Sequence, residues 1–567
     1  MFIKKGLSIL DSSSKIKIYF LIFSSLISSI LEVIGIGLAI PMVALITSQE
    51  ISQNYEALNF FLSFLDNFSQ FEKIKLVLFL FFFIFVIKNF YLLFQIFIQS
   101  KILQEIELTL SKKLLSKYFS MPYLSLKKRK SSELIRNLIA ETSAYAKNFI
   151  NPLIIILVES IILISIISLL ITYHFKIVFV VSVSIIFISF IFYIFFKNKN
   201  ILFGSLKQKY DSIRIKTIQE SFGAYKEIKI NNKEIFFINL FSTINKKTLD
   251  ASRYQFILNN IPRLAMEIIA IFTFCLLIFF SMKSENYNFV TILPTIAFFL
   301  TAIIRMLPSI NKIQVAFQSI KFSQPSVNLV LTEMSEINKI ERKEDNHYKI
   351  KFDNSIIFEN LSFEYEDNAH NKVLDRLNIK INKNQFIGVY GKTGSGKSTL
   401  LNILIGLITP TSGSIKIDEN IYEKKFFNSW LTNISYVPQN IFLFDDTIKK
   451  NITLHFDDSR FDQELFKKVI KITQLENFIE SLPLKENTII GEQNSKISGG
   501  QAQRIAIARA MYNKKNILIL DEATSSLDEK TEQLIIEELK KNMKDMTIIF
   551  VTHRTKNLQY CDQVINL

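Results

Sequence analysis

Cysteine is nearly absent from this sequence, which has 2 cysteines among 567 residues. Cys275 lies in an apolar run and Cys561 lies near the end of the chain, so neither a disulfide framework nor a cysteine-rich metal site is expected. Acidic residues are also fewer than basic ones, which gives a formal net charge of +16, although 49% of the residues are hydrophobic. Globular, disordered and fibrous classes fit this combination poorly, whereas apolar membrane spans joined by basic loops fit it well.

The first half of the chain contains many long apolar stretches. Six of them are near or above the roughly 20 residues that a helix needs to cross a bilayer. The first is too long for a cleavable signal peptide, and no small-residue cleavage site follows it. We predict membrane spans at about 18–47, 74–98, 150–172, 177–196, 257–282 and 290–315.

The charges of the connecting loops predict the orientation of these spans. Residues 100–148 hold about ten Lys and Arg against four Asp and Glu, and 197–256 are also basic, whereas 48–73 lean acidic. The positive-inside rule therefore places both termini and the two long loops in the cytoplasm. Nucleic-acid binding is the other interpretation of a basic chain, but here the basic residues flank membrane spans, so we expect no nucleic-acid partner.

The two basic loops are much longer than ordinary connections. Both show helical apolar periodicity, so we expect the membrane helices to continue into the cytoplasm and turn back near 122–131 and 219–232. Two small soluble insertions are the alternative. Residues 51–68 form an amphipathic segment that would lie in the outer membrane interface or pack on neighbouring spans.

The composition changes from about residue 333, where the chain becomes polar and charged. Short strand patterns and amphipathic helices follow, without a long apolar run, as is typical of a soluble α/β domain. We predict a transmembrane domain at 1–325, a linker at 326–350 and a soluble domain at 351–567.

A glycine-rich loop organises the soluble domain. It follows a predicted buried strand (386–390) and precedes a helix that begins at Thr399, which is the order strand, glycine loop, helix of the Walker A P-loop. Glycine lets backbone N–H groups close around phosphates, and the helix N-terminus favours their charge. A chance match in a glycine-containing turn is the alternative, which the flanking elements disfavour. The loop consists of Gly391, Lys392, Thr393, Gly394, Ser395, Gly396, Lys397 and Ser398.

The loop predicts ATP and Mg²⁺ as ligands. Lys397 would reach the β- and γ-phosphates, and the Ser398 hydroxyl would bind Mg²⁺. The apolar run 517–520 ends in Asp521 and Glu522, as a buried strand of the Walker B type does. Asp521 would hold Mg²⁺ beside the P-loop, and Glu522 is placed to act as the general base on the attacking water.

Residues 497–501 (Ile-Ser-Gly-Gly-Gln) resemble the LSGGQ signature of the ABC transporter superfamily, with Ile in place of Leu. Other motifs of that family appear in order around it. Tyr365 resembles the A-loop aromatic that stacks on adenine, Gln439 the Q-loop residue that links Mg²⁺ to the membrane domain, and His553 the H-loop residue that contacts the γ-phosphate. Singly, Tyr365 and His553 would more often have structural roles. Ser498, Gly499, Gly500 and Gln501 match the signature, Asp528 matches the D-loop, and Gly491-Glu492 matches the exporter X-loop, whereas 493–496 depart from it.

The resemblance covers about 355–567 in motif detail and the first half in architecture. Six spans followed by one nucleotide-binding domain resemble an ABC exporter half-transporter, which implies ATP hydrolysis coupled to transport. In this family the signature of one subunit completes the ATP site of the other, so the resemblance implies a homodimer with composite sites. It also implies that the turns near 122–131 and 219–232 are coupling helices. Relatives usually continue beyond the position of Leu567, so a trimmed C-terminus is a further expectation.

Charged residues within the predicted spans are the candidate cargo contacts, since such charges are costly in a membrane. Arg305 and Lys312 lie seven residues apart and therefore on one face of the sixth span. A cationic stripe facing a cavity suits an anionic head group such as a diphosphate. Structural pairing with Glu32 or Glu159, or snorkelling, is the alternative. The candidate substrate residues are Lys88, Arg263, Arg305 and Lys312.

Residues 30–41 of the first span, 304–310 of the sixth and the segment 51–68 resemble bacterial lipid-linked oligosaccharide flippases. This resemblance implies movement of a polyprenyl-diphosphate-linked glycan across the bacterial inner membrane, for protein glycosylation or surface glycan assembly. The alternatives are an ABC exporter of drugs or other lipids and a membrane-anchored regulatory ATPase without cargo. The complete set of ATP residues argues against the regulator, and six spans argue against a soluble DNA-repair-type ATPase.

Overall fold

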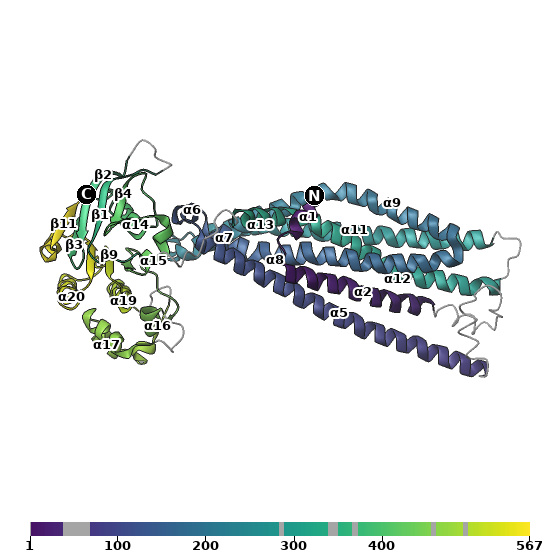
Figure 1. The fold of residues 1–567 in the computed structure, drawn as a ribbon. Helices are drawn as coiled ribbons and strands as arrows, with labels where there is room; N and C mark the ends of the chain where they lie inside the picture. The colour runs from purple at the N-terminus through teal and green to yellow at the C-terminus, as the bar shows by residue number, and fades with distance from the viewer. Residues whose placement is uncertain are drawn as a thin grey trace. The chain divides into compact units, whose positions relative to one another are not determined.

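The chain divides into two units in a computed structural model that describes residues 2–37, 69–282, 289–337, 350–365, 372–454, 461–491 and 497–567. One unit consists of Met1–Met121 and Lys127–Glu341, and the other of Pro122–Leu126 and Arg342–Leu567. The first is built from long helices, and the second contains the described strands (Figure 1).

In the part of the chain that the structure describes, the helical unit is dominated by five helices of 26 residues or more. Helix α5 begins with a capping box, in which Glu72 accepts the N–H of Ser69 at 2.9 Å and the Ser69 hydroxyl accepts from Glu72 N–H. The elements are α1 (Phe2–Leu7), α2 (Ser12–Gly37), α5 (Gln70–Ser120), α7 (Ser131–Arg136), the π-helical turn η1 (Asn137–Glu141), α8 (Thr142–Tyr145), the π-helical turn η2 (Ala146–Ile150), α9 (Asn151–Gly223), α10 (Tyr225–Ile230), α11 (Glu234–Met282), α12 (Phe289–Phe322) and α13 (Gln324–Ile337).

The predicted spans fall on these long helices. Within the described residues, Ser12–Gly35, Phe71–Ser120 and Ser131–Ile171 are long and apolar enough to cross a membrane. The third and fourth predicted spans both lie in α9, because residues 173–176, which the prediction treats as a break, contain neither Gly nor Pro and continue as helix. The count of six spans therefore stays a prediction. The residues 38–47 of the first predicted span and the amphipathic segment 51–68 lie outside the described residues.

The helices are much longer than a membrane crossing requires. Helix α5 has 51 residues, which corresponds to about 75 Å at the usual helical rise, against a hydrocarbon core of about 30 Å. The short helix α10 lies within the second predicted turn, 219–232. Large apolar side chains face outward along α5, where Phe79, Phe82 and Phe97 are each about two-thirds exposed. Such an apolar surface suits contact with lipid.

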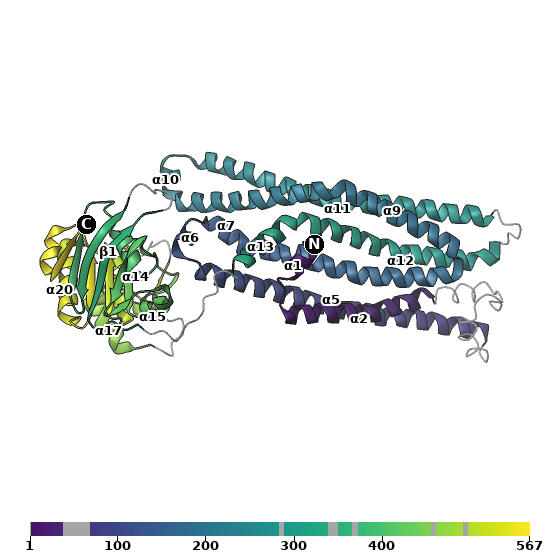
Figure 2. The ribbon, with the colours of Figure 1, turned by 45° about the horizontal axis from the view of Figure 1, so that its top comes forward.

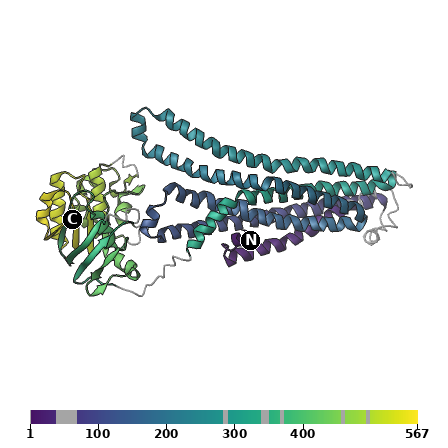
Figure 3. The ribbon, with the colours of Figure 1, turned by 90° about the horizontal axis from the view of Figure 1, so that it is seen from above.

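Two contacts show how closely helices of this unit pack against each other. Tyr145 is fully buried and donates a hydrogen bond from its hydroxyl to the Gly6 carbonyl oxygen at 2.8 Å, which ties α1 to α8. Helix α9 packs against α11 and α12, and the long helices run side by side (Figures 2 and 3). At Gly204 the α9 backbone comes so close to α12 that an added Cβ would lie 2.0 Å from the Phe322 carbonyl oxygen.

Helix α13 belongs to the helical unit, with Val327 and Val330 buried in its core. It occupies the first part of the range 326–350 that the sequence predicts as a linker, and the boundary between the units falls at Glu341–Arg342. Glu333 explains the difference: its charge suggests solvent, yet the carboxylate is buried because Lys117 and Arg129 donate to it at 3.0 and 2.6 Å.

The second unit is an α/β domain with an antiparallel sheet of order β2-β1-β4-β5, a parallel sheet of order β11-β3-β10-β9-β6 and the pair β7-β8. Strands β9 and β10 are buried throughout, as expected of a parallel sheet covered on both faces. The strands are β1 (Ser355–Phe363), β2 (Leu374–Asn382), β3 (Phe386–Tyr390), β4 (Ser412–Ile417), β5 (Asn420–Ile421), β6 (Ile434–Val437), β7 (Asp446–Thr447), β8 (Ile489–Ile490), β9 (Ile517–Asp521), β10 (Thr547–Val551) and β11 (Gln563–Asn566).

Helices connect these strands and cover the parallel sheet. The longest are α14 (Lys397–Ile405), α17 (Gln463–Ile472), α19 (Gly499–Tyr512) and α20 (Glu529–Asn542). The shorter ones are α15 (Phe427–Leu431), α16 (Ile448–Thr453), α18 (Glu476–Glu480) and the 3₁₀ turns η4 (Lys424–Phe426), η6 (Lys485–Asn487) and η7 (Thr555–Tyr560).

The first predicted turn contains the helix α6 (Tyr123–Lys127), and its residues Pro122–Leu126 cluster with the α/β domain. Tyr123 and Leu124 pack against a buried apolar cluster of that domain. Although Pro122–Leu126 lies between α5 and α7 in sequence, its contacts make it part of the α/β unit.

We expect Gly204→Ala to destabilise the helical unit, by about 1–3 kcal/mol as in other overpacked sites. In a helix without neighbours the same change would stabilise by roughly 1 kcal/mol. Gly223→Ala is the matched control, because an added Cβ there meets nothing within 4 Å. Thermal unfolding of the purified protein followed by circular dichroism should show a lower midpoint for Gly204→Ala alone; equal midpoints would contradict the close approach of α9 and α12.

Candidate nucleotide-binding site

The predicted site residues of the α/β domain follow the carboxyl ends of neighbouring parallel strands. The P-loop follows β3, His553 follows β10, Asp521 ends β9 with Glu522 directly after it, and Gln439 follows β6. Since β3, β10, β9 and β6 are adjacent and parallel, these ends meet at one edge of the sheet. Ligands of open α/β sheets bind at this edge, so the fold brings the predicted residues together there.

The P-loop conformation depends on two glycines with left-handed backbone angles. Gly394 has φ +84° and Gly396 has φ +94°, which other residues adopt only with strain. Gly396 is also the N-cap of α14, so the loop leads directly into a helix N-terminus that favours anions. The Ser395 hydroxyl oxygen is buried without a hydrogen-bond partner among the described residues. An orphaned polar atom inside a glycine loop fits a site for a phosphate group.

Lys397 and Asp521 bring opposite charges into the centre of the site. The Lys397 ammonium is buried and donates to the carbonyl oxygens of Gly391 and Lys392 at 2.8 and 3.0 Å. Asp521 accepts a hydrogen bond from the Tyr436 hydroxyl at 3.0 Å. Burial raises the pKa of Asp521, while the Tyr436 hydrogen bond and the charge of Lys397 act to lower it. A bound divalent cation would also lower it, because the positive charge favours the carboxylate.

Glu522 holds two of the other predicted residues. Its Oε2 accepts from the Gln439 side-chain amide at 2.7 Å, and its Oε1 lies 2.5 Å from His553 Nε2. Its φ is +51°, a left-handed conformation that costs about 1–2 kcal/mol for a residue other than glycine. Its backbone N–H is fixed to the Val551 carbonyl oxygen at 3.2 Å. Strain of this kind is common at functional sites, and here it accompanies a carboxylate held from both sides.

Tyr365, Ser398 and Gln439 are further residues that the sequence predicts to contact ATP or Mg²⁺. The Tyr365 ring packs edge-on against Phe363, and its hydroxyl lies 3.2 Å from Thr399 Oγ1. Ser398 and Gln439 are exposed. No group of three or more His, Cys, Asp or Glu that would hold a metal occurs in the described part of the chain. The predicted ligands Ser398, Gln439 and Asp521 include one carboxylate. Such a set fits Mg²⁺, which is bound through one or two carboxylates together with substrate phosphates rather than in a protein cage.

The signature residues do not join this group but line a separate hollow with the D-loop. Ser498 caps α19, its hydroxyl accepting the N–H of Gln501, whose side chain accepts the N–H of Ser498. Asp528 caps α20 by accepting the N–H of Thr531, which lowers the pKa of the carboxyl. The residues lining the hollow are Ser498, Gly499, Gly500, Arg504, Ser526, Leu527, Asp528 and Thr531. Glu492 of the predicted X-loop and the residues 493–496 that follow it lie outside the described residues.

The four candidate substrate cations of the helical unit are each paired with an acid. Lys88 and Arg305 both contact Glu32, which is 3% exposed, with Lys88 at 3.4 Å. Lys312 pairs with Glu159 at 2.5 Å, and Arg263 with Glu267 at 3.1 Å on an exposed face. Pairing, which the sequence left open as an alternative, is therefore the arrangement in the structure. It leaves the group of Glu32, Lys88 and Arg305 with one excess positive charge.

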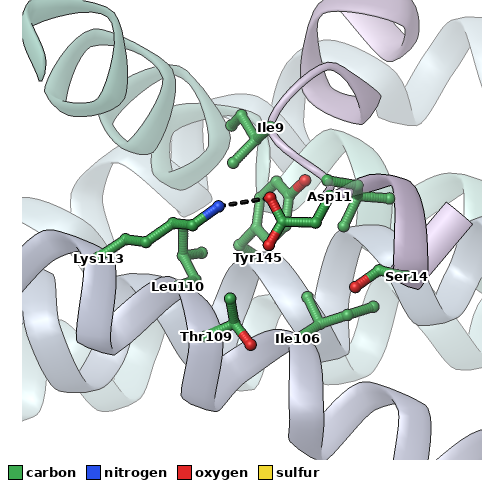
Figure 4. A pocket seen from close by; sticks show the side chains of 9 residues that line it. Ile9, Asp11, Ser14, Ile106, Thr109, Leu110, Lys113 and Tyr145 are labelled. Atoms are coloured by element: carbon green, nitrogen blue, oxygen red, sulfur yellow. Dashed lines mark hydrogen bonds and ion pairs between the residues drawn. The ribbon is translucent and has the colours of Figure 1, made fainter. Parts of the chain in front are cut away.

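A second hollow lies in the helical unit, between the α1–α2 turn and α5. Lys113 points across it and forms an ion pair with Asp11 (Figure 4). Ile106, Leu110 and Tyr145 form its apolar walls. It contains none of the motif residues, and its two charged groups are paired with each other.

Sequence reasoning assigned no role to three residues of the α/β domain that contact its motifs. Tyr436 binds Asp521, Gln503 binds the D-loop, and Arg554 contacts the D-loop backbone. Only the proximity of Arg554 to His553 in sequence hinted at a role. The contacts made by Gln503 and Arg554 depend on how α19 and the segment after β10 pack, which no local pattern reveals.

A strand–P-loop–helix unit, an acidic β9 end and a signature-capped helix together define an ABC-type nucleotide-binding domain. Residues 374–525 match the family model described as ABC transporter. A putative export ATP-binding/permease protein of Rickettsia typhi is 38% identical over 231 residues, or 40% of this chain. The match also spans 40% of the length of that relative.

Two comparisons extend into the helical unit. The ATP-dependent lipid A-core flippase of Paraburkholderia xenovorans is 26% identical over 350 residues, which is 61% of this chain and 58% of that protein. The structure of a bacterial Atm1-family ABC exporter with ATP bound matches with a TM-score of 0.77 at 19% identity, covering 98% of this chain and 94% of that one. The chain therefore has the fold of an ABC exporter, with a helical domain followed by an ABC domain.

We expect Gly396→Ala to weaken nucleotide binding far more than Gly394→Ala. Both changes put alanine at a positive φ, which costs about 1–2 kcal/mol. At Gly396 the added Cβ would also lie 2.9 Å from Leu374 Cδ2 and 3.0 Å from the Val373 carbonyl oxygen, whereas at Gly394 it meets nothing within 4 Å. Titration with a fluorescent ATP analogue should show a loss of about tenfold for Gly394→Ala and no saturable binding for Gly396→Ala. Equal affinities would refute this account of the loop.

Proposed function

We propose that this protein is an ATP-hydrolysing ABC exporter that works as a homodimer. The observation that carries the proposal is the position of Glu522, which is held between Gln439 and His553 beside Asp521 and the P-loop. A general base must be oriented toward the attacking water, and a carboxylate fixed from both sides meets this requirement. The exporter names of the relatives support the coupling of hydrolysis to transport.

Each residue has a separate task in this proposal. Lys397 moves from the loop carbonyls to the β- and γ-phosphates, and Tyr365 stacks on the adenine. Ser398, Asp521 and Gln439 would hold Mg²⁺, which when bound would supply positive charge next to the phosphates. Glu522 takes the proton from the water that attacks the γ-phosphate. His553 holds the Glu522 carboxylate and contacts the γ-phosphate.

The separate hollow at the signature supports a composite site. Ser498, Gly499 and Gly500 line it with D-loop residues, and no P-loop residue is among those that line it. The Ser498 hydroxyl and the N-terminus of α19 suit an anion, so the γ-phosphate of a second copy is the proposed occupant. Two copies related by twofold symmetry would then enclose two ATP molecules, since such an interface uses the same surface on both subunits.

We expect Glu522→Gln to bind ATP and to lose hydrolysis by about 10²–10⁴-fold, because an amide cannot accept the proton. Its hydrogen bond to Gln439 and its contact with His553 are retained only in part. Phosphate release and nucleotide binding should be measured on the same preparation, with Glu480→Gln at an exposed site of α18 as the control. Normal turnover of Glu522→Gln would remove the general-base assignment.

We propose a polyprenyl-diphosphate-linked oligosaccharide as the cargo, flipped from the cytoplasmic to the periplasmic leaflet of a bacterial inner membrane. The lipid A-core flippase among the relatives supports a large amphipathic lipid as cargo. Glu32 with Lys88 and Arg305 has one excess positive charge, and Arg305 is 30% exposed. A diphosphate that took the place of Glu32 as the partner of Arg305 would gain a bidentate contact.

An exporter of other lipids or of drugs is the second candidate. The pairing of Lys88, Arg305 and Lys312 with Glu32 and Glu159 favours it, because paired cations serve to join helices whatever the cargo. The two candidates differ in whether transport needs the charge of Arg305. A regulatory ATPase without cargo is disfavoured by the complete set Gln439, Glu522 and His553.

We expect Arg305→Gln to abolish flipping while basal ATP hydrolysis is kept. The measurement is ATP-dependent movement of a fluorescent polyprenyl-diphosphate glycan across liposomes that contain the purified protein. Lys216→Gln, which removes an exposed cation of the same unit, is the control. Unchanged flipping by Arg305→Gln would remove the diphosphate contact, and drug-stimulated hydrolysis without glycan movement would support the second candidate.

A further inference from the structure

Glu532 is a deeply buried carboxylate near the proposed base Glu522 and its partner His553, with 1% of its surface exposed. It lies on α20 and accepts two hydrogen bonds. Oε1 accepts from the Thr524 hydroxyl at 2.6 Å, and Oε2 accepts from the Arg554 guanidinium. Thr524 comes two residues after Glu522, and Arg554 comes directly after His553. Glu532 therefore joins the two segments that carry the proposed base and its histidine partner.

Arg554 extends this connection to the D-loop backbone. Its Nη2 donates to the carbonyl oxygens of Ser525 and Leu527, both at 3.4 Å, while Nη1 binds Glu532. A planar guanidinium can serve several acceptors in one fixed arrangement, which an ammonium cannot do. The D-loop is thus held in one conformation by a side chain that also fixes a buried charge.

Gln503 continues the connection to the signature helix. It is 3% exposed, and its amide donates to the Ser525 hydroxyl at 3.1 Å and accepts from the Ser526 N–H at 2.9 Å. Gln503 lies on α19, which Ser498 caps. A continuous set of hydrogen bonds therefore runs from the segments of Glu522 and His553, through Glu532, Arg554 and the D-loop, to the helix of the signature hollow.

We propose that Glu532 and Arg554 are positioning residues for ATP hydrolysis. They fix the positions of the D-loop and of the signature helix α19 relative to Glu522 and His553. When two copies close on each other, the general base Glu522 is then correctly placed. The inference rests on the proposed homodimeric ATPase and adds residues that touch neither nucleotide nor Mg²⁺. A buried carboxylate is costly unless fully paired, so this pair favours one geometry of the D-loop.

The chain offers a matched control for this pair. Lys556 of η7, two residues after Arg554, pairs with Glu529 of α20 at 2.8 Å, but both side chains are more than half exposed. Exposed pairs of this kind contribute little, so Lys556→Gln should hydrolyse ATP as the wild type does. The test variants are Arg554→Lys, which keeps a charge for Glu532 but cannot reach both D-loop carbonyls in the same arrangement, and Glu532→Gln.

The experiment is steady-state ATP hydrolysis of the full chain, with fluorescent ATP-analogue binding measured in parallel. We expect kcat to fall about 10–100-fold for Arg554→Lys and Glu532→Gln, as displaced catalytic groups generally cause. KM for ATP and analogue affinity should stay within about twofold, since P-loop contacts are untouched. An unchanged kcat, or a rise in KM that accounts for the whole loss, would overturn the proposal.

Hydrogen–deuterium exchange of the amides of 524–532 provides a readout that does not depend on turnover. Exchange should be faster in both variants than in the wild type and in Lys556→Gln, while exchange in 391–398 stays unchanged. Uniformly faster exchange throughout the domain would show a general stability effect and would also overturn the proposal. A wild type without ATPase activity would instead refute the proposed function, and the exchange of 524–532 would still test the positioning.

Discussion

The parallel register of β3, β10, β9 and β6 is the constraint on which the candidate site depends. Each strand ends at the same edge, so four segments far apart in sequence deliver their next residues to one place. The sheet can be parallel only because helices bury both of its faces, and β9 and β10 are accordingly buried along their whole length. The left-handed φ of Glu522 is tolerated because this sheet fixes the chain on either side of it.

The α/β domain was largely predictable from local patterns. A glycine loop between a strand and a helix, and an apolar strand ended by two acids, specify both an element and its chemistry within a few residues. The contacts of Glu532 and Arg554 were not predictable in this way. Two charged residues 22 positions apart suggest solvent-exposed sites, and only the packing of α20 against the segment after β10 buries the carboxylate.

The helical unit was less predictable, because hydropathy gives the length of a helix but not its rotation or its neighbours. The sequence indicated which charges lie in apolar segments but not that Glu32 would be shared by Lys88 and Arg305. It indicated a break within 173–176 where α9 continues. It also assigned Glu333 to a solvated linker, whereas Glu333 lies on α13 and its carboxylate is buried against Lys117 and Arg129.

The membership of Pro122–Leu126 in the α/β unit bears on how that unit behaves when cut from the rest. Tyr123 and Leu124 cover part of the buried apolar cluster of that unit, and they come from a part of the chain more than 200 residues before residue 350. A fragment beginning at residue 350 would carry all the candidate nucleotide-site residues but leave this patch exposed to water. Truncation would therefore impair the solubility of the fragment rather than its chemistry.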